Sequence, residues 1–134
     1  MILENYLEQH ENIKTQIAVI EKLSVGNGIE ENAAQIGKEI SHLAGVIKVH
    51  LSSEEKFMYP KLIESTDEVV QRTAKSYQTE MGNLLEVFTV FKDKYNTKPR
   101  IIENRASFSK DLKEITYQLM KRMDKEEKEL YKLL

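Results

Sequence analysis

Apolar side chains recur along this chain at spacings of three and four residues, which is the periodicity of an amphipathic helix. Four long segments carry this pattern, and none alternates with the two-residue period of a strand. Turn-forming residues cluster at positions 24–28, 65–68 and 96–99 and separate the segments. Short connections between long helices predict an all-α fold, an antiparallel up-down-up-down four-helix bundle, as a single domain over residues 1–134. The predicted stripes are Leu3, Tyr6, His10, Ile13, Ile17 and Ile20; Ile36, Ile40, Leu43, Ile47, His50, Glu54 and Met58; Val70, Ala74, Tyr77, Glu80 or Met81, Leu84, Phe88 and Phe91; and Phe108, Leu112, Ile115, Leu119, Arg122, Glu126, Leu130 and Leu133.

Local signals refine the boundary between the second and third helices. Pro60 predicts a kink or an early end of the second helix, because proline removes a backbone donor. Ser65 and Glu68 have the spacing of a capping box, which predicts the start of the third helix. Equal numbers of residues separate His50 and Glu80 from Ser65, so an antiparallel pair places them at one height.

Each apolar stripe is interrupted in one narrow zone by polar residues. These residues are His10, then His50 with Glu54, then Glu80, then Arg122 with Glu126. A constant offset in numbering relates His50 and Glu54 to Arg122 and Glu126, so the two helical hairpins look like related halves, each bringing polar residues to the middle.

A buried layer of three acids and two histidines needs compensation, because an unpaired carboxylate in a core costs several kcal/mol. Divalent cations supply it, and bundles build di-iron or di-manganese sites from such inward carboxylates and histidines. The chain has no cysteine, and its oxygen and nitrogen donors suit iron or manganese, with zinc also possible. Alternatively, Arg122 pairs with Glu80 and Glu126 in a salt-bridge network, which leaves the domain with one metal or none.

Composition narrows the classes of partner. The 134 residues carry 31% charged side chains and a formal net charge of -2, which favours neither nucleic acid nor membrane surfaces. No apolar run is long enough to span a bilayer and the N-terminus does not have the pattern of a signal peptide, so we expect a cytoplasmic location.

Several short motifs resemble those of the hemerythrin-like, HHE cation-binding domain family over nearly the whole chain. They are Gln9-His10, His50-Leu51, Glu54-Glu55, Tyr59-Pro60, Glu126-Glu127 and Leu130-Tyr131, together with Leu43-Ala44-Gly45, Glu80-Met81-Gly82 and Arg122, which resemble a bacterial subgroup. The resemblance implies a four-helix bundle around a di-iron site that binds O2, peroxide or NO, or that senses iron or redox state.

The resemblance also implies the ligands. His10, His50, Glu54 and Glu126 match family ligands, with Glu127 as a substitute for Glu126. Glu80 and Arg122 stand where the family usually has two further histidines, and Glu80 is an expected fifth ligand.

Three further residues are expected to support this site. Arg122 would orient a carboxylate or offset excess negative charge. Tyr6 and Tyr77 lie near the layer, where they would donate hydrogen bonds to the ligands. Glu127 and Glu55 point away from the stripes and are expected to be solvated, and His42 is expected to flank the site.

A carboxylate-rich site favours ferric iron, so we expect oxidase-like, peroxide-reactive or iron-sensing behaviour rather than oxygen transport. One alternative is a small di-iron peroxidase or oxidase, and another is a helical interaction module without metal. A sensing output would pass to another protein, and the chain would act as a monomer or a homodimer.

Overall fold

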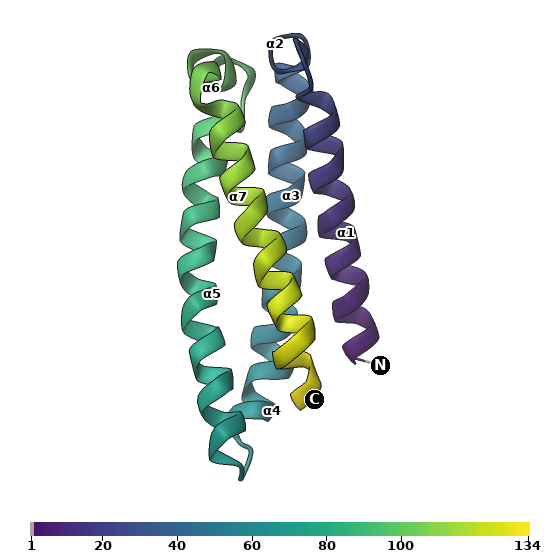
Figure 1. Cartoon of the computed structure of the whole chain (residues 1–134), viewed down its shortest axis with the longest axis vertical. Coiled ribbons are helices and arrows are strands. Elements are labelled where there is room, and N and C mark those ends of the chain that lie inside the picture. Colours follow the sequence, from purple (N-terminus) through teal and green to yellow (C-terminus); the bar gives the residue numbers. More distant parts are fainter. Residues whose placement is uncertain (1) are drawn as a thin grey trace.

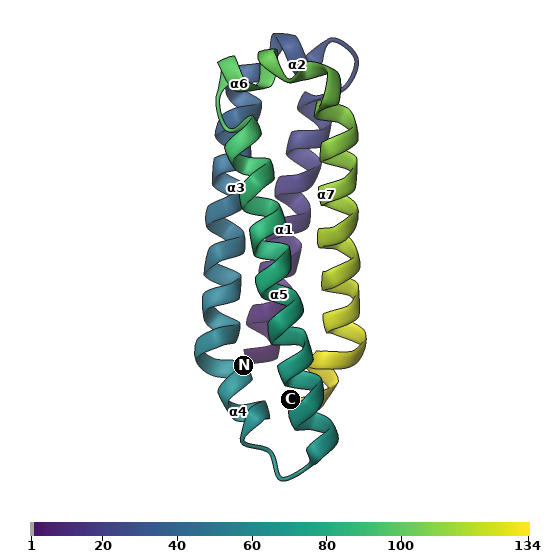
Figure 2. The same cartoon turned by 90° about the vertical axis from the view of Figure 1, so that its left-hand side faces the viewer.

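A computed structural model describes residues 2–134, except for the side chain of Ile2, and these residues contain helices and no strand. Four long helices lie alongside one another, and the direction of the chain alternates from each to the next (Figures 1 and 2). They are α1 (Ile2–Leu23), α3 (Ala33–Ser53), α5 (Glu68–Tyr95) and α7 (Arg105–Lys125). Among the described residues, no helix has the length and apolarity needed to cross a membrane.

Short helices connect the long ones at both ends of the molecule. At one end lie α2 (Gly28–Glu31) and α6 (Lys98–Glu103), and at the other lies α4 (Tyr59–Ile63), followed by the turn into α5 (Figure 1). The connections coincide with the turns that the sequence predicts. The helix start differs in one detail from the predicted capping box: the Asp67 carboxylate, rather than Ser65, accepts the hydrogen bond from the Val69 N–H, at 2.9 Å.

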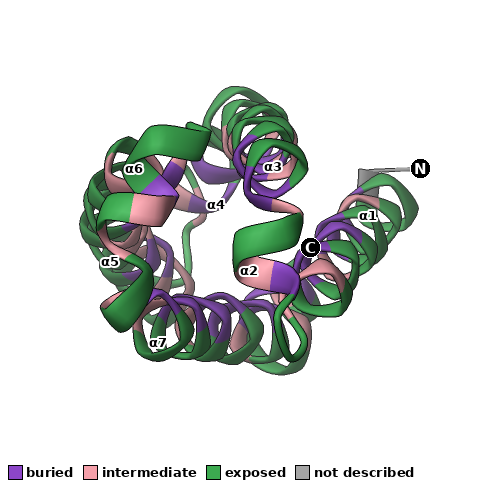
Figure 3. Cartoon of the chain, turned by 90° about the horizontal axis from the view of Figure 1, so that it is seen from above, coloured by how far each residue is buried: buried purple, intermediate pink, exposed green. Residues whose placement is uncertain are grey.

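The buried faces of the long helices turn toward one another and the exposed faces toward solvent (Figure 3). One apolar cluster includes Ile36, Phe88, Phe91 and Phe108 near the end that carries α2 and α6. Each fully buried side chain of this kind contributes about 1.5–3 kcal/mol to folding. Leu3 was expected in the first stripe, but it is 39% exposed because it lies in the first turn of α1, beyond the last packed residue.

A second cluster fills the opposite end, and it is rich in tyrosine. Its buried members are Tyr6, Met58, Tyr59, Leu62, Ala74, Tyr77, Leu130 and Tyr131. Along α1, along α3 and α7 and at the residues that directly follow these two helices, the polar residues predicted from the sequence fall between the two apolar clusters. The fold therefore places them as one layer inside the protein rather than at an end.

Two π-helical turns interrupt the long helices at this layer. α3 continues into η1 (Glu54–Met58), and α7 continues into η2 (Glu126–Leu130), which is followed by η3 (Tyr131–Leu133). Each π-turn begins with a glutamate of the predicted site, and Pro60 follows the first as the second residue of α4. A π-turn widens the helix and brings residues five apart toward one face, and such turns often occur at functional sites.

Candidate metal centre

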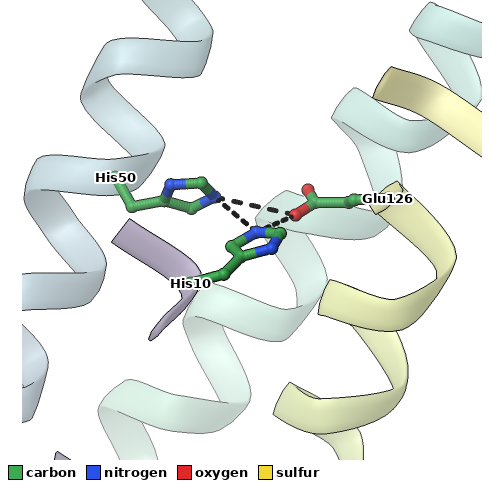
Figure 4. A group of neighbouring side chains, drawn as sticks. All are labelled: His10, His50 and Glu126. Atoms are coloured by element: carbon green, nitrogen blue, oxygen red, sulfur yellow. Dashed lines mark hydrogen bonds and ion pairs between the residues drawn. The ribbon is translucent and has the colours of Figure 1, made fainter. Parts of the chain in front are cut away.

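The side chains of His10, His50 and Glu126 converge from α1, α3 and the start of η2 (Figure 4). His10 Nε2 lies 3.1 Å from His50 Nε2 and 2.9 Å from Glu126 Oε1, and His50 Nε2 lies 3.6 Å from Glu126 Oε1. All three side chains are buried. Two imidazole nitrogens and a carboxylate oxygen at such separations are a donor set suited to a divalent or trivalent cation.

The second ring nitrogen of each histidine has an acceptor of its own. Glu127 Oε2 lies 2.9 Å from His10 Nδ1, and Gln9 Oε1 lies 2.7 Å from His50 Nδ1. An oxygen acceptor at Nδ1 places the proton there and turns the Nε2 lone pair toward the site, as is usual for metal-binding histidines. The expectation that Glu127 is solvated is therefore wrong: it is half-buried, because the start of η2 brings its carboxylate to the Nδ1 atom of His10.

Glu54 is fully buried beside the three converging residues. Its Oε2 atom lies 3.4 Å from His50 Nε2. Its Oε1 atom has no hydrogen-bond partner, alone among the buried side-chain nitrogen and oxygen atoms of the described residues. A buried carboxylate oxygen without a partner costs free energy of folding, and a bound cation removes that cost. The residues present therefore fit a metal ion.

Arg122 is the counterpart of His50 in the internal repeat and lies in the other half of the layer. It is buried, and its Nε donates to Glu126 Oε2 at 3.1 Å. Its Nη2 donates to the Tyr77 carbonyl at 2.9 Å and to the Tyr59 hydroxyl at 3.2 Å. The guanidinium also lies over the Tyr77 ring, 4.6 Å from its centroid. The two oxygens of Glu126 thus face different partners, the Arg122 guanidinium on one side and the histidines on the other.

Glu80 does not join the buried donors, contrary to its predicted place in the layer. Its side chain is 48% exposed, and its Oε2 atom accepts from Arg122 Nη1 at 3.2 Å and from Lys125 Nζ at 3.4 Å. Arg122 is the physical reason, because its long side chain fills the interior space and meets Glu80 at the surface. Two parts of the predicted salt-bridge network, Arg122 with Glu80 and Arg122 with Glu126, are present.

The hydroxyls of Tyr6 and Tyr77 bond to backbone carbonyls rather than to the candidate ligands. Tyr6 donates to the Ser53 carbonyl at 3.2 Å, and Tyr77 donates to the Lys125 carbonyl at 3.3 Å and to the Glu129 carboxylate. These carbonyls directly precede the two π-turns. Each tyrosine therefore binds the backbone of a neighbouring helix where that helix widens, Tyr6 from α1 to α3 and Tyr77 from α5 to α7. Tyr6 also packs edge-on against the His50 ring.

The charges of the layer perturb one another strongly. Burial alone would lower the pKa of His50, but hydrogen bonds to Glu126 and Glu54 outweigh it and raise this pKa to about 9. Burial raises the pKa of Glu54. Glu126 is buried too, yet His10, His50 and Arg122 hold its pKa far below the usual range. The metal-free layer therefore holds a proton at a position suited to a cation.

Comparison with known protein families agrees with this arrangement. The model of the hemerythrin HHE cation-binding domain matches residues 1–134. The chain belongs to this family. Comparison with curated proteins gives no match. Comparison with solved structures gives none. Membership of a cation-binding family and the buried cluster of His10, His50 and Glu126 both indicate a bound metal, typically iron in hemerythrin domains.

Tyr131 is a site residue that the periodicity of the sequence did not reveal. Its hydroxyl lies 3.0 Å from His10 Nε2 and 2.9 Å from Glu54 Oε2. In a regular α-helix, residues five apart differ by about 140° in direction, so Tyr131 would point away from Glu126. The π-turn between them removes this difference. The internal repeat is the sequence feature that could have pointed to Tyr131, since Tyr59 and Tyr131 are separated by the same number of residues as Glu54 and Glu126.

Proposed function

We propose that this chain is a non-haem iron protein that holds its metal at His10, His50 and Glu126, beside the buried carboxylate of Glu54, and uses it to sense or handle a small ligand. O2, peroxide, NO and iron itself are the candidates that its family membership supports. The observation that carries the proposal is the buried cluster with an unsatisfied carboxylate oxygen at Glu54. The architecture that we infer for it is the antiparallel up-down-up-down four-helix bundle.

The chain's own residues hold and orient the metal. Glu127 and Gln9 fix the ring orientations of His10 and His50, so that both Nε2 atoms are available as donors. The apolar clusters on either side of the layer exclude bulk water and strengthen each electrostatic contact within it. Bound iron would supply redox chemistry and an exchangeable coordination position at this place.

We propose that the centre holds one ion rather than the two predicted from the sequence. A second ion would lie in the half of the layer related to the first by the internal repeat. There the Arg122 guanidinium already neutralises Glu126 Oε2, and no histidine is present. Glu80, the remaining predicted ligand of that half, is held at the surface by Arg122 and Lys125. The positive charge of Arg122 thus takes the place of a second metal ion.

A small apolar cavity adjoins the site, and its size supports the proposal that the ligand is small. It measures about 20 Å³ and is lined by His50, Arg122 and Glu126 together with apolar residues of α3 and α5 such as Leu51 and Leu84. That volume accommodates about one water-sized molecule. A small ligand of about this size has room beside the centre.

Metal analysis tests the proposal. The chain is expressed with ample iron, desalted and analysed for metals, and we expect about one iron per chain. His50→Ala should bind much less metal, and it should also lack the stabilisation of the fold that the bound metal provides. His42→Ala is the matched control, because His42 is exposed on the same helix. Unchanged metal in His50→Ala would refute the site, and a stoichiometry of two would restore the dinuclear prediction. A metal-free native chain would favour the alternative of a helical interaction module.

A further inference from the structure

The oxygen of Tyr131 lies among the donor atoms of the centre. Besides its contacts with His10 and Glu54, it lies 3.4 Å from His50 Nε2 and 3.4 Å from Glu126 Oε1. The side chain is buried. Its ring stacks on the rings of His10 and Tyr6, with centroids 5.3 Å and 5.5 Å away. The hydroxyl is therefore held in place from both sides.

Four atoms of this group form a compact tetrahedron: His10 Nε2, His50 Nε2, Glu126 Oε1 and Tyr131 Oη. The shortest of its six edges is 2.9 Å and the longest is 3.6 Å. The centre of a tetrahedron of this size lies about 2.0 Å from each corner, which is the length of a metal–nitrogen or metal–oxygen bond in proteins. Glu54 Oε2 lies just outside, against the Tyr131 corner.

We propose that Tyr131 is a ligand of the metal, bound through its phenolate oxygen and completing a set with His10, His50 and Glu126. This inference rests on the metal-binding function proposed above and adds a residue to it. A tyrosinate favours ferric over ferrous iron, because it is a hard anionic donor. The carboxylate ligands also favour ferric iron, and the tyrosinate would strengthen that preference.

Glu54 has a defined part in forming this ligand. The Tyr131 hydroxyl donates to Glu54 Oε2 at 2.9 Å. When the metal binds, the O–H bond of Tyr131 breaks, its electron pair goes to the metal, and the proton passes to the Glu54 carboxylate. No oxidant or other reactant is needed. The buried carboxyl then becomes neutral, which reduces the cost of keeping Glu54 away from water.

The structure contains an internal comparison for this role. Tyr59 is the counterpart of Tyr131 in the other half of the repeat, and both residues directly follow a π-turn. The Tyr59 hydroxyl accepts a hydrogen bond from Arg122 Nη2 at 3.2 Å. A guanidinium donates a hydrogen bond and leaves the phenol O–H intact, whereas a bound metal replaces the phenol proton. Tyr59 and Tyr131 are therefore similar in burial and position but differ in the cation that they face.

Spectroscopy of the ferric protein tests the proposal. The metal-free chain is loaded with ferrous iron without oxygen, oxidised in air and desalted, and its iron is counted. A phenolate bound to ferric iron gives an intense visible charge-transfer band, and excitation within it enhances tyrosinate ring vibrations in the Raman spectrum. We expect both signals in the native chain and in Tyr59→Phe. Tyr131→Phe should lose both, and its iron affinity should fall about tenfold or more.

The outcomes separate this proposal from the one on which it rests. Iron bound without the charge-transfer band in the native chain would refute the tyrosinate and leave the metal site standing. A band that persists in Tyr131→Phe would refute it as well, because another group would then be its source. A native chain that binds no iron would overturn both proposals. If Tyr131→Phe does not fold, absence of the band from the native chain still refutes the tyrosinate, and loss of the band in Tyr59→Phe, Tyr6→Phe or Tyr77→Phe refutes its assignment to Tyr131.

Discussion

Replacement of Arg122 by methionine removes the guanidinium, the permanently charged cation that the chain supplies to the interior of the layer. Methionine keeps much of the length of arginine and lacks its charge and donors. Glu126 would then keep a buried carboxylate with one oxygen unpaired, and the Tyr77 carbonyl and Tyr59 hydroxyl would each lose a donor. Breaking a buried ion pair by removing one partner costs about 3–5 kcal/mol.

We expect a loss of about 3–5 kcal/mol in the free energy of unfolding of the metal-free protein. That is a large part of the roughly 5–15 kcal/mol by which domains are stable. Urea unfolding followed by far-ultraviolet circular dichroism, after removal of metal by a chelator, measures it. Glu80→Gln is the control, because this half-exposed partner of Arg122 should contribute at most about 1 kcal/mol.

A double variant gives the prediction its sharpest form. Glu126→Gln in the Arg122→Met background removes the carboxylate charge that has lost its guanidinium partner, so part of the lost stability should return. A loss below about 1 kcal/mol in Arg122→Met, or no recovery in the double variant, would show that the guanidinium does not stabilise Glu126. The assignment of Arg122 as a substitute cation would then fail.

Three further outcomes follow from the same structure. Gln9→Ala removes the acceptor that orients His50 and should weaken metal binding by about 10–100-fold in a competition assay with a chelator, without loss of helix content. The pKa of His50 is raised to about 9, so the charged His50 contributes its full stabilisation of the metal-free protein below about pH 6.5 and loses it as the pH rises through 9. Metal affinity should increase over the same pH interval, because the metal displaces the His50 proton. A metal affinity that does not change with pH, in titrations at several pH values, would contradict this. Tyr95→Phe, far from the layer, removes a hydrogen bond to Asp111 and should cost about 1.5–3 kcal/mol in urea unfolding while the iron content stays unchanged.

The sequence predicts the helical fold and the residues of the layer well, because both depend on periodicity. The stripe along α3 and into η1 is a clear case: Ile36, Ile40, Ile47, His50 and Glu54 are all buried as expected. In a regular helix, residue spacing alone determines which residues share a face, so this face can be predicted without knowing the neighbouring helices. His10 and Glu126 were predicted on the same basis, and both are buried in the layer.

The parts that the sequence did not predict depend on departures from a regular helix or on side-chain length. Tyr131 reaches the centre only because a π-turn shifts its direction, and residue spacing alone does not reveal a π-turn. Glu80 has the correct height on α5, yet the reach of Arg122 keeps it at the surface. Glu127 contacts His10 from the residue beside a predicted ligand, a position that the periodicity assigns to solvent.

Glu126 offers one oxygen to the histidines and the other to Arg122, and this division links the interior to the surface. A change of charge or position at Oε1 alters the pull on Oε2, and Arg122 connects Oε2 directly to the partly exposed carboxylate of Glu80. Lys125 shares that carboxylate. A change of charge at the centre would therefore act through side chains in direct contact, Glu126, Arg122 and Glu80, on a group of partly exposed charges on α5 and α7.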